Sequence, residues 1–265
     1  MKNNIPSIIL KETFTQHLSF QPKNDFMDNN NDLLMRTRLL LGDETMERIS
    51  RAKVIIFGVG GVGSWCAESL VRSGIRHLTI VDNDRVCPTN INRQLMATVE
   101  TVGREKVEAL KERLLTLNPE AEIDARMQTF CEETVGEFGL DGFDYIIDAI
   151  DSLKDKALLI ETACRTQARF FSSMGAALKL DPTKIKVAEF WKVQGCPLAR
   201  ALRHSFRKSK TRPARKFQCV YSDELLKNRG VQDASQPNGS LMHITATFGL
   251  MIAGMVLQDL NGNDL

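Results

Sequence analysis

A set of closely spaced glycines and one aspartate are the first residues in this chain whose types suggest chemistry. Gly58, Gly60 and Gly63 form a G-x-G-x-x-G pattern between a β-branched run and an apolar-periodic helix. The first allows a tight strand-to-helix turn, the second lets an anion approach the backbone, and the third lets helix and strand pack closely. Backbone N–H groups around Gly61 and the helix N-terminus would cradle a phosphate. Asp82, about 20 residues further on, is placed to bind a ribose, although the glycines could serve only a tight turn.

The residues that follow Asp82 favour a triphosphate over a redox dinucleotide. An acid at Asp84, an amide at Asn90 and two cations, Arg93 and Lys106, come within one loop and the next helix start. A triphosphate that is to be cleaved needs fixed donors and positive charge around it, which Arg and Lys supply. Up to Asp82 an NAD-dependent enzyme fits the pattern equally well, and only this second cluster separates the two.

Two further carboxylates, Asp148 and Asp151, lie at the end of the apolar run 143–150. The carboxyl ends of strands form the ligand crevice of a doubly wound sheet, so we expect both to face the same region as Asp82. Asp151 is a natural Mg²⁺ ligand there, because Mg²⁺ is held by one or two carboxylates plus substrate phosphates. It could instead cap a helix predicted over 153–168.

Alternating strand and helix patterns predict the scaffold for these residues. We expect an α/β fold: a doubly wound, Rossmann-like, mostly parallel sheet with a C-terminal antiparallel extension and helices. The predicted strands are 53–57, 77–81, 122–127, 143–150, 169–174, 184–191 and 216–221. The predicted helices are 33–49 (interrupted near Gly42), 62–72, 103–117, 131–138, 153–168 and 241–257.

Composition is that of an ordinary globular protein, with 43% hydrophobic and 26% charged residues over 265 positions. The six cysteines are scattered without a C-x-x-C pair, which argues against a disulfide framework and a structural zinc site. The N-terminus lacks the pattern of a signal peptide, so we expect a cytoplasmic protein with reduced thiols. The 17-residue apolar run 241–257 is at the short limit for a bilayer, and we expect a buried helix rather than a membrane contact.

The segment 200–216 carries a local positive charge that the net charge of +2 conceals. Leu198, Leu202 and Phe206 recur every four residues, so the first half can dock one helix face, with Arg203, His204 and Arg207 projecting outward. Such a field favours nucleic-acid binding through phosphate contacts; a solvated face is the alternative. The segment has no acid and contains eight cations: Arg200, Arg203, Arg207, Lys208, Lys210, Arg212, Arg215 and Lys216.

The segment from Asp82 to Gln94 resembles the ubiquitin-activating-enzyme-like superfamily of ATP-dependent adenylating enzymes. The superfamily motif, D-x-D-x-V-x-x-[ST]-N-x-x-R-Q, is matched at every position. A later pattern, S-x-x-G-A-A-x-x-x-D-P-T-x-I followed by the basic segment and Cys-Val-[Phe/Tyr]-Ser, resembles the superfamily's tRNA threonylcarbamoyladenosine dehydratase branch. The resemblance covers roughly residues 33–258.

This resemblance implies roles for individual residues. Arg36 matches an arginine that reaches into the ATP site of a partner subunit, which implies a homodimer. Asp151 aligns with the catalytic aspartate, although Ser152 stands where an asparagine usually follows. In related activators a cysteine takes the acyl group as a thioester, which makes Cys219 a candidate nucleophile; a small buried hydrophobe is the alternative.

The implied activity is ATP- and Mg²⁺-dependent cyclisation of threonylcarbamoyladenosine in tRNA, through adenylation of its carboxylate. The resemblance also allows a sulfur-transfer protein as a further partner. The expected organisation is a flexible arm over 1–31 and a single domain over 32–265, divided into a nucleotide-binding core (53–175) and a substrate- and RNA-binding part (176–265).

Three other functions remain open at this stage. The chain could adenylate the C-terminus of a ubiquitin-like sulfur carrier, although the missing zinc cysteines and the basic segment count against this. It could be an NAD-dependent oxidoreductase, in which Arg93, Lys106 and Asp151 would lack a purpose. It could also be a non-catalytic RNA-binding protein on a relic nucleotide fold, which would have no reason to keep every phosphate ligand.

Overall fold

The computed structural model describes residues 30–230 and 237–262. The described residues from Leu34 onward form one compact unit. The arm predicted over 1–31 falls almost wholly outside the described residues. Helix α1 (Asn30–Arg51) is interrupted at Gly42, whose φ of 78° and ψ of 165° are not helical, as the sequence predicts.

A seven-stranded sheet in the order β3-β2-β1-β4-β5-β7-β6 forms the centre of the fold. All neighbouring strands are parallel except β6 and β7, which pair antiparallel at one edge. This confirms the predicted mostly parallel sheet with an antiparallel extension. The strands are β1 (Lys53–Phe57), β2 (His77–Val81), β3 (Glu122–Arg126), β4 (Tyr145–Asp148), β5 (Arg169–Ser173), β6 (Ile185–Glu189) and β7 (Gln218–Ser222).

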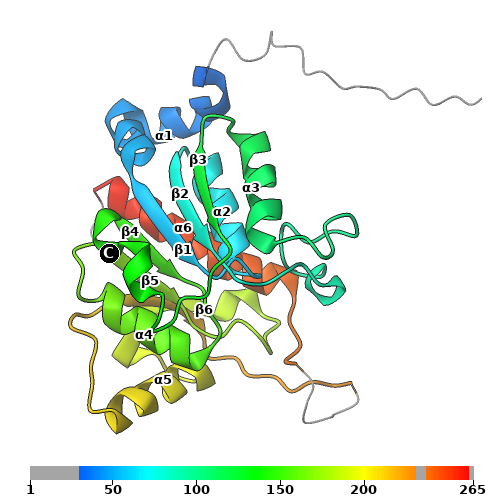
Figure 1. Cartoon of the computed structure of the whole chain (residues 1–265), viewed down its shortest axis with the longest axis vertical. Coiled ribbons are helices and arrows are strands. Elements are labelled where there is room, and N and C mark those ends of the chain that lie inside the picture. The colour runs from blue at the N-terminus through cyan, green and yellow to red at the C-terminus, as the bar shows by residue number, and fades with distance from the viewer. Residues whose placement is uncertain (1–29, 231–236, 263–265) are drawn as a thin grey trace, which may run out of the picture. The chain divides into compact units, whose positions relative to one another are not determined.

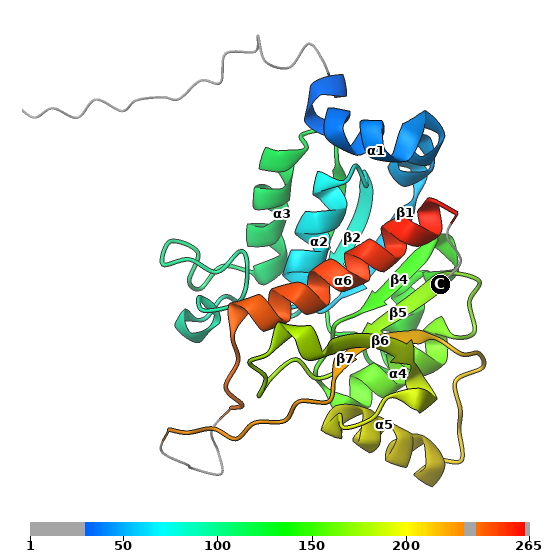
Figure 2. The same cartoon turned by 180° about the vertical axis from the view of Figure 1, so that it is seen from behind.

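Helices cover both faces of the sheet (Figures 1 and 2). Because strand side chains alternate between faces, β1 supplies Val54 and Ile56 to one core cluster and Ile55 and Phe57 to the other. Helices α2 (Gly63–Arg72), α3 (Lys106–Leu117) and α6 (Met242–Leu260) pack on the first cluster. Helices α4 (Leu153–Ala163) and α5 (Pro197–Lys208) pack on the second.

Three predicted helices have other bounds in the structure. The helix predicted over 153–168 ends at Ala163. The helix expected from Gly103 begins at Lys106, because Gly103 has a φ of 86° and its N–H donates to the carbonyl of Val86 in a turn. The loose helix expected over 131–138 is only a 3₁₀ turn at Val135–Phe138. The connection between β3 and β4 therefore contains no α-helix.

Helix α6 is the one helix in the described part of the chain that is long and apolar enough to cross a membrane. Half of its apolar window is buried in the protein. A Cβ at Gly249 would lie 2.4 Å from the carbonyl oxygen of Val62 and 2.9 Å from the backbone nitrogen of Cys66. The glycine thus lets α6 and α2 touch at backbone distance, and α6 packs as a core helix, as predicted.

Candidate nucleotide-binding and active site

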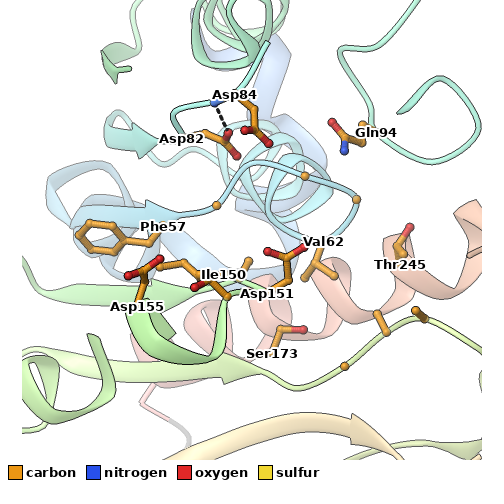
Figure 3. Close-up of a pocket in the computed structure, with 18 of the residues that line it drawn as sticks. Phe57, Val62, Asp82, Asp84, Gln94, Ile150, Asp151, Asp155, Ser173 and Thr245 are labelled. Carbon is orange, nitrogen blue, oxygen red and sulfur yellow. Dashed lines mark hydrogen bonds between the residues drawn. The ribbon is translucent and has the colours of Figure 1, made fainter. Parts of the chain in front are cut away.

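A cavity of about 680 Å³ opens at the carboxyl ends of β1, β2, β4 and β5, where a doubly wound sheet binds its ligand. In Figure 3, Asp82, Asp84 and Gln94 lie on one side of the glycine turn, and Asp151 lies across the turn from them. Eight predicted residues line this cavity: Gly58, Gly60, Gly61, Asp82, Asp84, Arg93, Lys106 and Asp151.

The glycines of the turn differ in what they serve. Gly58 has a φ of 85°, and a Cβ there would lie 2.7 Å from the carbonyl oxygen of Ala149. A Cβ at Gly63 would lie 1.8 Å from the carbonyl oxygen of Gly58. Both are therefore required by the fold itself. A Cβ at Gly60 would meet only Gln94, at 3.7 Å, so the chain leaves free space over Gly60 on the cavity side.

Asp82 ties the glycine turn to the end of β2. Its carboxylate accepts the backbone N–H of Val59 at 2.8 Å and that of Asp84 at 3.0 Å. Burial raises the pKa of Asp82, and the charge of Lys106 opposes this rise. Each carboxylate oxygen keeps a free lone pair, so Asp82 can accept from a ligand hydroxyl group while it holds the turn.

Two cations face the cavity from separate elements. Lys106, at the start of α3, is buried and lies 2.6 Å from Asp84 and 3.8 Å from Asp82. Arg93 donates to the carbonyl of Thr89 at 2.9 Å and to the side chain of Asn92 at 3.0 Å, both through one terminal nitrogen. The guanidinium carries five N–H donors, so most of them stay available for an anion.

Asp151 lies on the exposed side of the β4–α4 loop, and Asp155 lines the same cavity from the first turn of α4. Asp155 was not among the residues predicted from the sequence. Its position four residues after Asp151, one helical turn on, is the signal that could have found it. No group of three or more His, Cys, Asp or Glu side chains is arranged for a metal in the described residues, so this pair would need ligand oxygens to complete a metal site.

Two predicted ligands, Asn90 and Asp148, do not reach the cavity. The side chain of Asn90 accepts the backbone N–H of Cys87 at 3.0 Å and caps the turn Pro88–Asn90. Asp148 is fully buried and forms an ion pair with Lys156 at 2.7 Å. Direct nucleotide contact by Asp148 was therefore the wrong expectation, because its side chain points under α4 rather than into the crevice.

Arg36 and Cys219 also lie outside the cavity lining. Arg36 is exposed on α1. Cys219 is fully buried in β7, and burial raises the pKa of its thiol well above the ordinary value. Since the thiolate is the nucleophile, this environment fits a core residue and corrects the catalytic role considered for Cys219.

The basic segment divides into exposed and structural cations. Arg203, expected to project outward, is half-buried and donates to the carbonyls of Phe190 and Val193 at 3.0 and 2.9 Å. Arg215 donates to the carbonyls of Ala163 and Ala168. Six cations stay exposed on and after α5: Arg200, Arg207, Lys208, Lys210, Arg212 and Lys216.

The far half of the cavity lies beyond the carboxyl end of β5. Ser173, Gly175 and Ala176 line it from the end of β5, and Leu198 lines it from the first turn of α5. The basic helix thus begins at the cavity wall. Gln94 is 6% exposed, and its Oε1 has no hydrogen-bond partner among the described residues. Its amide lines the cavity and is therefore available to bind a ligand.

Comparisons with known proteins agree with this geometry. A sequence model of the ThiF family matches residues 33–264. The tRNA threonylcarbamoyladenosine dehydratase of Bacillus subtilis (strain 168) is 37% identical over 238 residues, which cover 85% of this chain and 93% of that protein. The Escherichia coli (strain K12) dehydratase is 32% identical over 243 residues, covering 84% and 91%.

Solved structures give the same result. The crystal structure of the E. coli dehydratase TcdA in complex with ATP has a TM-score of 0.80 and 33% identity, covering 88% of this chain and 95% of that chain. A sulfur carrier protein adenylyltransferase of Thermus thermophilus is 33% identical over only 123 residues, which cover 46% of this chain and 45% of that protein. The chain belongs to the ThiF family and, within it, to the tRNA threonylcarbamoyladenosine dehydratases.

Proposed function

We propose that this protein is an ATP-dependent enzyme that dehydrates threonylcarbamoyladenosine in tRNA to a cyclic product. One observation carries the proposal: a single cavity joins a nucleotide half, built by the glycine turn and Asp82, to a far half that begins at the basic helix α5. Such a cavity can hold ATP beside a nucleoside that is still attached to RNA.

The residues of the nucleotide half fit ATP. Asp82 has free lone pairs for the ribose hydroxyl groups, and the open space over Gly60 lets a phosphate approach the backbone N–H groups at the start of α2. Arg93 and Lys106 would neutralise the triphosphate, because guanidinium and ammonium groups bind phosphate oxygens strongly. The unpaired amide of Gln94 would complete the site.

In the reaction, the threonyl carboxylate attacks the α-phosphate and displaces pyrophosphate, giving an acyl-adenylate. A nucleophile of the same modified side chain then attacks the activated carbonyl, loses its proton and releases AMP, so one carboxylate oxygen leaves with AMP. The cations stabilise charge that develops on the phosphate in the transition state.

Asp151 and Asp155 would hold Mg²⁺, because two carboxylates beside a triphosphate are the donor set that this ion prefers. Bound there, Mg²⁺ would neutralise phosphate charge and polarise the phosphate oxygens. We extend the proposal to a homodimer, in which the exposed Arg36 would serve the cavity of a second copy, and to tRNA binding by the exposed cations of α5.

Release of AMP and pyrophosphate tests the function. We expect release from ATP with tRNA that carries the threonylcarbamoyl group, none with tRNA that lacks it, and loss of the mass of one water from the nucleoside. With ¹⁸O in the substrate carboxylate, the label should appear in AMP. Release with a ubiquitin-like carrier protein instead of the modified tRNA would contradict the proposal.

Alanine at two glycines of the turn separates ligand binding from folding. We expect Gly60→Ala to keep the wild-type melting temperature but to weaken binding of ATP about tenfold or more, since its methyl group occupies only the phosphate space. Gly63→Ala should lose about 3 kcal/mol or more of stability, because the new Cβ meets the carbonyl of Gly58. Calorimetric nucleotide titration and thermal unfolding measure both, and wild-type nucleotide affinity in Gly60→Ala would refute the phosphate cradle.

A further inference from the structure

A fully buried ion pair lies next to the cavity, between β4 and α4. The Nζ of Lys156 lies 2.7 Å from Oδ2 of Asp148, and both side chains are 0% exposed. The hydroxyl of Ser172 on β5 donates to the same carboxylate oxygen at 2.6 Å. None of these three side chains lines the cavity.

The pair holds both backbone polar groups of Ile150. The N–H of Ile150 donates to Oδ1 of Asp148 at 3.1 Å, and its carbonyl accepts from Nζ of Lys156 at 2.9 Å. The carboxylate of Asp148 thus binds the peptide unit before Ile150, and the ammonium group of Lys156 binds the peptide unit after it. The next residue is Asp151, whose backbone N–H belongs to the same peptide unit as the carbonyl of Ile150 that Lys156 binds.

The same loop is tied to the glycine turn. The N–H of Ala149 donates to the carbonyl of Phe57 at 2.8 Å, and the carbonyl of Ala149 is the group that a Cβ at Gly58 would strike. Figure 3 shows Ile150 and Asp151 beside the glycine turn, with Ser173, the neighbour of Ser172, on the opposite strand end. The buried pair therefore connects the ends of β1, β4 and β5 at the site.

Stability alone is a poor reason for such a pair. Desolvating two ions costs several kcal/mol for each, and apolar replacements of similar volume are often as stable. A fixed geometry is what the pair supplies, since each ion is satisfied by partners from a different element.

We infer that Lys156 and Asp148 are positioning residues that hold the 149–152 loop so that Asp151 presents its carboxylate to the Mg²⁺–ATP complex. This inference rests on the proposed function for the identity of the ligand. It assigns Asp148 an indirect role in place of the direct nucleotide contact expected from the sequence.

The test replaces both ions together, as Asp148→Asn with Lys156→Met. The two new side chains are neutral and of similar volume, so we expect a melting temperature close to that of the wild type, while the carbonyl of Ile150 loses its donor. Mn²⁺ binding, measured by electron paramagnetic resonance with a non-hydrolysable ATP analogue, should weaken about tenfold or more. The Mg²⁺ concentration that half-saturates AMP release should rise by a similar factor, with the KM for tRNA unchanged.

Ser172→Ala covers the case in which the double variant does not fold. It removes one hydrogen bond to Asp148 and keeps both charges. We expect Mn²⁺ affinity to fall by a smaller but measurable factor.

The control is an ion pair away from the cavity in which Glu68 is buried and Arg113 is exposed, with Arg72 as a second partner of Glu68. Glu68 is 7% exposed on its side chain and accepts from Arg113 through two bonds of 2.9 Å, and neither residue lines the cavity. Glu68→Gln with Arg113→Met should change stability without moving Mn²⁺ affinity.

Wild-type Mn²⁺ affinity in a folded Asp148→Asn, Lys156→Met protein would overturn the inference, as would an equal shift in the control. The metal titration uses no tRNA. A failure of the dehydratase assignment would therefore leave its result intact, and the two failures can be told apart.

Discussion

Arg93→Ala is expected to fold normally and to lose about 10²- to 10³-fold in kcat for AMP release, the effect of removing one preorganised donor from developing charge. The side-chain bonds of Arg93 reach only Thr89 and Asn92, within four residues of it. The bond from the indole of Trp65 goes to its backbone carbonyl and survives the substitution. No long-range packing is therefore lost, while the triphosphate loses its guanidinium. Initial rates at saturating substrates, with thermal unfolding alongside, measure the two effects.

Arg85→Ala is the control for this experiment. Arg85 lies in the loop that follows β2 and is exposed. It forms an ion pair with Glu105 at 2.9 Å and does not line the cavity. It should retain the wild-type rate. Near-normal turnover in Arg93→Ala, or an equal loss in Arg85→Ala, would show that the arginine does not act on the triphosphate. Arg93→Lys should recover part of the rate, because a point charge remains without the planar fork.

Removing three exposed cations of α5 should weaken tRNA binding and leave ATP binding unchanged. Arg200→Ala, Arg207→Ala and Lys208→Ala together delete charges on the exposed side of the helix. Arg203 is kept, because it holds the carbonyls of Phe190 and Val193. Each lost phosphate contact should reduce the slope of log affinity against log salt by about 0.7 to 0.9. Filter binding of tRNA across a salt series measures the slope, and nucleotide titration checks the cavity.

A charge-matched control uses exposed cations from other elements, namely Arg51, Lys53 and Arg72 replaced together by alanine. It should bind tRNA with a nearly unchanged salt slope. If both triple variants lose the same affinity, the binding follows net charge and not the surface of α5. An unchanged slope in the α5 variant would place the tRNA elsewhere on the protein.

The order of elements and the nucleotide half of the cavity were readable from the sequence. The run Lys53–Phe57, the glycine turn and Asp82 follow local rules: a short β-branched apolar run ended by glycine, a φ that only glycine accepts easily, and strand ends that meet at one edge. The cations after Asp82 were found for the same reason, because the chain returns them to that edge within one loop. These features depend on neighbours close in sequence, so the amino-acid order determines them.

The positions of three other predicted site residues depended on which group, distant in sequence, lies next to each side chain. Asp148 alternates with Ile147 along β4 and so points under α4, where Lys156 neutralises it. Arg203 turns inward because two carbonyls from the segment after β6 face it, and Cys219 is sealed in the core because β7 lies between β5 and β6. Strand order, helix placement and the burial they impose decide these roles, since no local pattern records which element will cover a given face. The sequence therefore determined most of the elements and the glycine turn, and only the tertiary structure separated the residues that line the cavity from those that are buried beside it.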